Sequence, residues 1–408
     1  MDLHMAARMG NHNIVKRSLE ENDIDINLRD YIGQTPLHLA SLNGHDNVIK
    51  LLLKMDEIDL NARNVEGQTP LHLAAKKGHK DVANLLLEMD EIDLNSQDTS
   101  GQTPLLWAAK NRHEQVVKLM LKKDEINLNS QDTSGQTPLS LAAENGCDIV
   151  VKLLLEQAGV DLSLRDSYRQ TPLHLAAKKG HKDVANLLLE MDEIDLNSQD
   201  TSGQTPLLWA AKNRHEQVVK LMLKKDKTDL HIQDNDGRTP LSWAAENGHK
   251  SMIRLLLNAA INRNSEAYSN RTPLSWAAEH GYKRVVKLLL EDGVDPNVHD
   301  NNGRTPLLWA IENDHKGVIE LLAQNDSTTL HLLAREGEIA PIKSIISTNY
   351  DINTTNNLGR TALHISTSYH HLEVAKLLIS SGAHVNVKDI NGATPLRLAI
   401  AKRSSVSG

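Results

Sequence analysis

The chain has 408 residues, with 45 Lys and Arg against 53 Asp and Glu, and its formal net charge is −8. This mild acidity argues against a general nucleic-acid-binding protein. A single cysteine, Cys147, excludes an internal disulfide framework and suits a reducing compartment. Apolar residues make up 39% of the chain, yet it has no Phe and only 3% aromatic residues, so we expect a thin core of Leu, Ala, Val and Ile.

A threonine followed by Pro-Leu or a close variant recurs along the whole chain. Successive copies are 34 residues apart six times, then 33, 33, 23, 33 and 33, and Leu3-His4 marks one further copy upstream. A fixed period near 33 with Thr-Pro-Leu-His inside it predicts stacked helical repeats, each packed only on its neighbours. The marker residues are Thr35, Thr69, Thr103, Thr137, Thr171, Thr205, Thr239, Thr272, Thr305, Thr328, Thr361 and Thr394.

Each repeat is predicted to be a turn, a helix, a second turn and a second helix. In one copy, Asn302-Gly303 predicts a tight turn, Thr305 is a good helix N-cap, and Pro306 suits the first helical position because its missing N–H is not needed there. A glycine or its substitute ends the first helix, and an apolar stripe at helical spacing, as in 285–290, marks the second.

The period alone would also fit tetratricopeptide repeats, but their Trp-x-x-Leu-Gly and Tyr positions are absent. The segment 67–87, GQTPLHLAAKKGHKDVANLLL, and its copies resemble the ankyrin repeat family over essentially the whole chain. The variants GRTPLSWAAENGH (237–249) and TPLLWA resemble arrays of fungal proteins. The resemblance implies an all-α solenoid of about 12–13 helix-turn-helix repeats with projecting β-turn or hairpin tips.

The repeats divide into two predicted blocks. Residues 1–325 form a main array of repeats 1–10, in which 68–124 recurs without a change at 170–226. The step of 23 residues removes a connecting loop and its turn, so one projecting tip should be missing there. A smaller block over 326–402 and a tail over 403–408 follow. Arg169 and Asn270 stand where other turns have glycine, and the turn at Arg169 should be loose or strained.

Residues with chemical potential have structural interpretations here. Histidines recur at two repeat positions, so members of a set lie about 10 Å apart, too far to share one zinc ion. We expect them to hydrogen-bond local backbone and Thr groups, and the five tryptophans to pack in the core. With no catalytic motif or phosphate loop, we predict no enzyme, no cofactor and no metal site. The histidine sets are His4, His38, His72, His174, His331 and His364, and His12, His45, His79, His113, His181, His215, His249, His315 and His371.

The resemblance implies that partners contact the turn tips and the concave face formed by the first helices. By position, the tip residues are Tyr31, Ile32, Glu66, Tyr168, Asp236 and Tyr268, of which the tyrosines suit energetic anchors. The ends of the first helices carry Lys76, Lys77, Lys110, Glu144, Lys178, Lys179, Lys212, Glu246, Glu279 and Glu312. Lysine at a helix C-terminus also complements the helix dipole. The glutamates do not, so we predict a face that changes sign along its length and an extended partner of complementary charge.

The sequence therefore predicts a non-catalytic scaffold or adaptor that binds one or more proteins, as a monomer, without nucleic acid. The alternative is a recognition or regulatory subunit of a larger signalling or enzyme complex. No run of about 18 apolar residues exists, so we expect no membrane insertion. The first repeat begins at Leu3, with no secretory signal before it, so we expect the protein in the cytoplasm, with the nucleus as the alternative.

Overall fold

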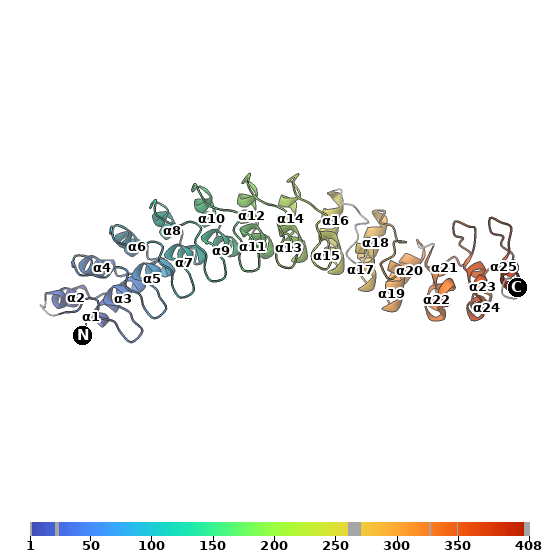
Figure 1. Cartoon of the computed structure of the whole chain (residues 1–408), viewed down its shortest axis with the longest axis horizontal. Helices are drawn as coiled ribbons and strands as arrows, with labels where there is room; N and C mark the ends of the chain where they lie inside the picture. The colour runs from blue at the N-terminus through green and yellow to red at the C-terminus, as the bar shows by residue number, and fades with distance from the viewer. Residues whose placement is uncertain (1, 21–23, 260–270, 326–327, 349, 404–408) are drawn as a thin grey trace. The chain divides into compact units, whose positions relative to one another are not determined.

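The structure is a computed structural model that describes residues 2–20, 24–259, 271–325, 328–348 and 350–403. It divides into two compact units, Met1–Thr228 (unit 1) and Asp229–Gly408 (unit 2). The regular secondary structure of the described residues is entirely helical, as predicted (Figure 1). The predicted block boundary after residue 325 is a different division of the chain and stays a prediction.

The described residues of unit 1 form seven helix pairs, stacked so that each first helix contacts the next first helix and each second helix contacts the next second helix. Figure 1 shows the two rows of helices with the turn tips projecting from the row of first helices. The first helices are α1 (Leu3–Arg8), α3 (Pro36–Asn43), α5 (Pro70–Lys77), α7 (Pro104–Lys110), α9 (Pro138–Glu144), α11 (Pro172–Lys179) and α13 (Pro206–Lys212). The second helices are α2 (His12–Leu19), α4 (Asp46–Leu52), α6 (Lys80–Leu87), α8 (Glu114–Met120), α10 (Asp148–Leu155), α12 (Lys182–Leu189) and α14 (Glu216–Met222).

In unit 2, the part of the chain that the structure describes forms five further pairs and one more first helix, α25. Its first helices are α15 (Pro240–Glu246), α17 (Pro273–Glu279), α19 (Pro306–Glu312), α21 (Thr329–Glu336), α23 (Ala362–Ser368) and α25 (Pro395–Arg403). Its second helices are α16 (Lys250–Asn258), α18 (Lys283–Glu291), α20 (Lys316–Ala323), α22 (Ile339–Ile346) and α24 (Leu372–Ser380). In both units the core is Leu, Ala, Val and Ile at the helix interfaces, with buried Met120 and Met222.

The first helices begin as the sequence predicts. The Thr69 side chain accepts a hydrogen bond from the backbone N–H of His72, and proline fills the first helical position. Gly78 ends this helix with φ of +75°, a left-handed conformation that glycine adopts without strain. A short helix of seven or eight residues is marginal in isolation, so these helices depend on the caps and on packing between repeats.

The turn tips are closed by an Asp or Asn side chain and linked to one another by backbone hydrogen bonds. The Asp98 carboxylate accepts from the backbone N–H groups of Ser100 and Gln102 at 2.9 and 3.0 Å, and the N–H of Thr99 donates to the carbonyl of Glu66 in the preceding tip at 2.9 Å. Arg169 keeps this geometry: its N–H donates to the Asp166 carbonyl at 2.8 Å. Its φ of +61° makes this turn strained rather than loose.

The shortened step changes the stacking within unit 2. Here α19 contacts α22, the second helix of the next pair, and the hydroxyl groups of Thr305 and Thr329 are 2.6 Å apart. The backbone of Thr328 is in the helical region and its side chain makes no N-cap hydrogen bond. In Figure 1 the second helices α16 and α18 lie on one side of their first helices, whereas α22 and α24 lie on the other. Within unit 2, the second helices thus change side after the shortened step.

Candidate surface for partner binding

The buried histidines connect successive repeats. In His72, Nδ1 contacts the Thr69 hydroxyl at 2.8 Å, and Nε2 lies 3.0 Å from the carbonyl oxygen of Gln102 in the next repeat. His174 makes the equivalent contacts with Thr171 and Gln204. Burial lowers the pKa of both imidazoles to about 4, so they are neutral at pH 7. The predicted structural role is confirmed, and it extends across the repeat interface.

The histidines after the first helices contact the preceding repeat. His113 Nε2 lies 3.0 Å from the Lys76 carbonyl oxygen, and its ring covers Gly78 so closely that a Cβ there would be 2.4 Å from Nδ1. His12 does not belong to this set. It lies inside α2, and Asn11 caps that helix in the position that His45 takes in the next repeat.

Where this glycine is replaced, the histidine of the next repeat can be replaced too. Arg112 has φ of +62° in the position of Gly78, and Cys147 stands where the covering histidine would be. The Arg112 guanidinium donates to the carbonyl of Asn145 in that repeat. Cys147 is buried, and desolvation raises the pKa of its thiol, so its sulfur is not activated for nucleophilic chemistry.

Trp107 and two lysines form a cluster that we name the first clamp (Lys76, Trp107 and Lys110). The indole N–H donates to the Asp98 carboxylate at 2.9 Å, which fixes the orientation of the ring. The ammonium groups of Lys76 and Lys110 lie 4.3 and 5.1 Å from the ring centroid, within cation–π distance. Two positive charges therefore converge on one oriented aromatic surface.

The internal duplication reproduces this cluster as the second clamp (Lys178, Trp209 and Lys212). The two ammonium groups lie 4.5 and 5.0 Å from the ring of Trp209, whose indole N–H donates to Asp200 at 2.9 Å. The repeat between the clamps has Glu144 in place of a lysine, and Glu144 contacts Lys179 at 3.5 Å and Gln136 at 2.9 Å. The lysines at the ends of the first helices of unit 1 thus keep a net positive charge. We call this set the lysine row: Lys76, Lys77, Lys110, Lys178, Lys179 and Lys212.

The glutamates of unit 2 have arginine partners in the same repeats. Glu246 contacts Arg238 at 3.6 Å, Glu279 pairs with Arg271, and Glu312 contacts Arg304 at 3.3 Å. The predicted change of sign along the face did not take these arginines into account. They lie in the turns and compensate the carboxylates within the chain. Partner contact by Glu246, Glu279 and Glu312 stays a prediction.

The same arginines stack on the tryptophans of unit 2. The Arg271 guanidinium lies 3.8 Å from the ring centroid of Trp276 and 4.0 Å from that of Trp309 in the next repeat. Arg238 likewise covers Trp243 at 4.5 Å and Trp276 at 5.0 Å. Arginine and tryptophan thus alternate along the face, where unit 1 has lysine and tryptophan.

The sequence predicted that all five tryptophans pack in the core, but this is wrong for four of them. Trp243 is 9% exposed, whereas Trp107, Trp209, Trp276 and Trp309 are half-buried beneath their cations. The sequence contains a signal for which cation covers each tryptophan. In the copies of unit 2 that contain a tryptophan, an arginine stands just before the cap threonine and a glutamate follows eight residues later, as in Arg238 and Glu246. In the copies that contain the clamps, the same two positions hold glutamine and lysine.

The tip residues named from the sequence are exposed where the structure describes them. Tyr31 is 94% exposed and Tyr168 66% exposed, and their rings contribute nothing to the core. Further tip residues at the surface are the half-buried Ile32 and the exposed Glu66 and Asp236, whose carboxylate lies 3.8 Å from Arg238. Tyr268 and Asn270 lie outside the described residues.

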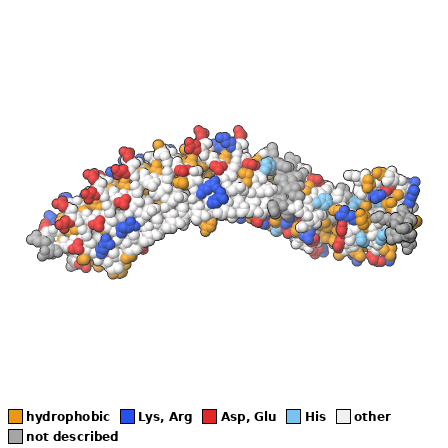
Figure 2. All heavy atoms as spheres, viewed as in Figure 1, with side chains coloured by type: hydrophobic (Ala, Val, Ile, Leu, Met, Phe, Trp, Pro, Cys, Tyr) orange, Lys and Arg blue, Asp and Glu red, His pale blue; other side chains and the backbone are white. Residues whose placement is uncertain are grey.

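The loops that follow the second helices of unit 1 carry exposed acidic pairs, and Figure 2 shows acidic side chains along that edge. The exposed pairs are Asp56 and Glu57, Asp90 and Glu91, Asp124 and Glu125, and Asp192 and Glu193. The loops after α8 and α14 also carry lysines, so charges of both signs lie on this edge: Lys122, Lys123, Lys224 and Lys225. The lysine row lies at the ends of the first helices, where its excess of positive charge attracts an acidic partner segment.

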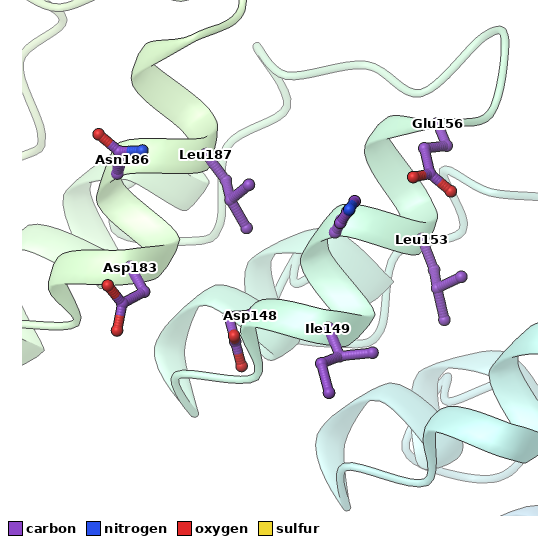
Figure 3. Close-up of a pocket in the computed structure, with 8 residues that line it drawn as sticks. Asp148, Ile149, Leu153, Glu156, Asp183, Asn186 and Leu187 are labelled. Carbon is purple, nitrogen blue, oxygen red and sulfur yellow. The ribbon is translucent and has the colours of Figure 1, made fainter.

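A shallow groove lies between the second helices α10 and α12. It has a volume of about 620 Å³, and Figure 3 shows Ile149, Leu153 and Leu187 along it with carboxylates at its ends. Asp148, Glu156 and Asp183 outnumber the one lysine, Lys152. The groove is open and mildly acidic, and it lies away from the clamps.

Within the described part of the chain, no three His, Cys, Asp or Glu side chains are grouped to hold a metal ion. None of the helices there is long and apolar enough to cross a membrane.

Models of the ankyrin repeat (three copies) match the chain in overlapping segments from residue 3 to residue 406. The chain is 30% identical over 77 residues to the candidate palmitoyltransferase ZDHHC13 of Danio rerio, covering 19% of this chain and 12% of that protein. It is 30% identical over 86 residues to human Rabankyrin-5, covering 21% of this chain and 7% of that protein. It is 40% identical over 63 residues to the ankyrin repeat protein FPV230 of Fowlpox virus, covering 15% of this chain and 32% of that protein.

The aligned segments thus span less than a third of each of these relatives. They come from two vertebrates and a virus, and the fungal resemblance stays a prediction. Ankyrin repeats are generally protein–protein interaction modules. Because the family models match nearly every residue and the helix pairs follow the same period, this chain belongs to the ankyrin repeat family.

Proposed function

We propose that the chain is a non-catalytic scaffold whose lysine row binds an acidic segment of a partner protein. The observation that carries the proposal is the convergence of two ammonium groups on each of two oriented tryptophans. Carboxylates of a partner would pair with the lysines, while its aromatic or aliphatic side chains would pack on the exposed parts of the rings. Arg, Trp and Tyr dominate the energetics of such surfaces.

The tips are proposed to contribute a second, smaller contact. Tyr31 and Tyr168 project from a row of turns that backbone hydrogen bonds hold in register, so little conformational entropy is lost when they bind. The match of short segments to much longer relatives supports an alternative in which the array is the recognition part of a larger complex.

The test is purification of partners with a charge-reversed variant and a matched control. One variant changes Lys76, Lys110, Lys178 and Lys212 to Glu. The control changes four exposed lysines of the second helices to Glu, namely Lys80, Lys118, Lys182 and Lys220, which are also two pairs related by the duplication. We expect the first variant to lose partners that the wild type and the control retain. Equal loss in both, or no loss in either, would contradict the lysine row as the binding surface.

A further inference from the structure

We propose that the two clamps are equivalent sites that bind two copies of one acidic motif, so that the protein selects partners carrying that motif in tandem. This inference rests on the proposed function of the lysine row. Residues 68–124 and 170–226 are identical, and both clamps lie wholly within these segments. The same side chains in the same helices must present the same chemistry twice.

The geometry of the two clamps agrees closely. The shorter lysine–ring distance is 4.3 Å in one and 4.5 Å in the other, and the longer is 5.1 and 5.0 Å. Both indole N–H groups donate to a buried aspartate at 2.9 Å. A segment that recognises one clamp therefore recognises the other with a similar intrinsic affinity.

Their surroundings differ in one respect. Glu144 separates the clamps and pairs with Lys179 beside the second one, whereas the first clamp has no such carboxylate before it in the sequence, where Leu42 stands. At physiological ionic strength the Debye length is about 8 Å, so a neighbouring paired charge has a limited effect. We expect the two affinities to agree within about threefold.

The separation of the clamps sets the spacing of the motif. Three repeats at about 10 Å each place them roughly 30 Å apart. An extended chain needs about nine residues to span this distance. A hexaglutamate block, about 20 Å when extended, reaches one clamp only. A Gly-Ser linker of about 20 residues has a root-mean-square length near 25 Å and allows two blocks to bind together. A probe with the same linker but with hexaglutamine in place of one block can occupy only one clamp.

The probes are hexaglutamate, two hexaglutamate blocks joined by the linker, and the same linked probe with hexaglutamine as its second block. Calorimetry gives the stoichiometry, and the indole N–H resonances of Trp107 and Trp209 report each clamp separately. We expect two hexaglutamates per chain, with both resonances shifting at similar concentrations. The probe with two hexaglutamate blocks should bind about 100-fold more tightly than a single block, as expected for linked binding events. The probe with one hexaglutamine block should not show this gain.

Substitutions separate the two proposals. Lys76→Ala with Lys110→Ala, or Lys178→Ala with Lys212→Ala, should leave one hexaglutamate per chain and abolish the gain from the second hexaglutamate block. Lys80→Ala with Lys182→Ala on the second helices should change neither. Binding at only one clamp, or a probe with two hexaglutamate blocks that binds no more tightly than the probe with one hexaglutamine block, would overturn the tandem inference while leaving the lysine row as a binding surface. Hexaglutamate binding that neither clamp variant weakens, or no binding at all, would overturn both.

Discussion

Replacing Gly281 by Ala tests the packing of histidine on glycine between repeats, and Gly248 provides a matched control in the adjacent repeat. Both glycines have positive φ, +70° and +65°, so alanine is strained at either position. At Gly281 a Cβ would lie 2.6 Å from Nδ1 of His315, whereas at Gly248 the nearest atom is in the Tyr282 ring at 3.5 Å. Only the first substitution forces a neighbour to move.

The magnitudes follow from these contacts. Left-handed backbone costs alanine about 1–2 kcal/mol at both sites. At Gly281 the displaced ring also loses its hydrogen bond to the Glu279 carbonyl, 2.8 Å in the wild type, which adds about 1 kcal/mol. We therefore expect Gly281→Ala to lower the free energy of unfolding by about 1–2 kcal/mol more than Gly248→Ala.

Urea unfolding followed by circular dichroism measures this difference. A His315→Ala background supplies a further check, because Gly281→Ala should there cost no more than Gly248→Ala does in the wild type. Equal costs for the two glycine substitutions in the wild type would refute the packing argument. So would a Gly281→Ala cost that is unchanged in the His315→Ala background.

Three further outcomes are expected from the same interfaces. Because His72 and His174 have pKa values of about 4 when folded and near 6.5 when unfolded, the unfolded chain binds more protons between these values. Stability should therefore fall as the pH drops from about 6.5 to 4, and His174→Ser should reduce this fall by up to about 3 kcal/mol in urea titrations at several pH values. Arg112→Ala should lower the free energy of unfolding by about 1 kcal/mol, because it removes the hydrogen bond from the guanidinium to the Asn145 carbonyl of the next repeat, and thermal unfolding should show the loss. Trp243→Phe should cost about 1–3 kcal/mol more than Trp276→Phe in urea unfolding, because the buried indole N–H of Trp243 has a carboxylate acceptor and that of Trp276 has none among the described residues.

The sequence predicts the helices well because their determinants are local. Thr69 and Pro70 define the start of α5, Gly78 defines its end, and the fixed period places every later copy. The buried role of His72 also follows from the pattern, since a repeat position cannot gather ligands around one ion.

The remaining features depend on contacts between residues about one repeat apart. The pattern inside one repeat does not show that Arg271 covers Trp309, or that Arg112 donates to the Asn145 carbonyl of the next repeat. Glu279 therefore looked like an exposed acidic residue in the sequence, although an arginine eight residues earlier compensates it. Comparing neighbouring copies would have indicated this pair, because Arg238 with Glu246 and Arg304 with Glu312 repeat it. The change of side of the second helices after α20 was likewise not predicted, because the repeat pattern marks the position of the shortened step but not its geometry.

Zero-length carbodiimide cross-linking tests the central claim most directly, because it joins lysine ammonium groups only to carboxylates in contact with them. The chain would be cross-linked to a partner recovered with the wild type and lost with the charge-reversed lysine row, and the linked peptides identified by mass spectrometry. If the lysine row is the binding surface, links form from Lys76, Lys110 and Lys178 to aspartate or glutamate of the partner. Links confined to lysines of the second helices, such as Lys118 and Lys220, would contradict it.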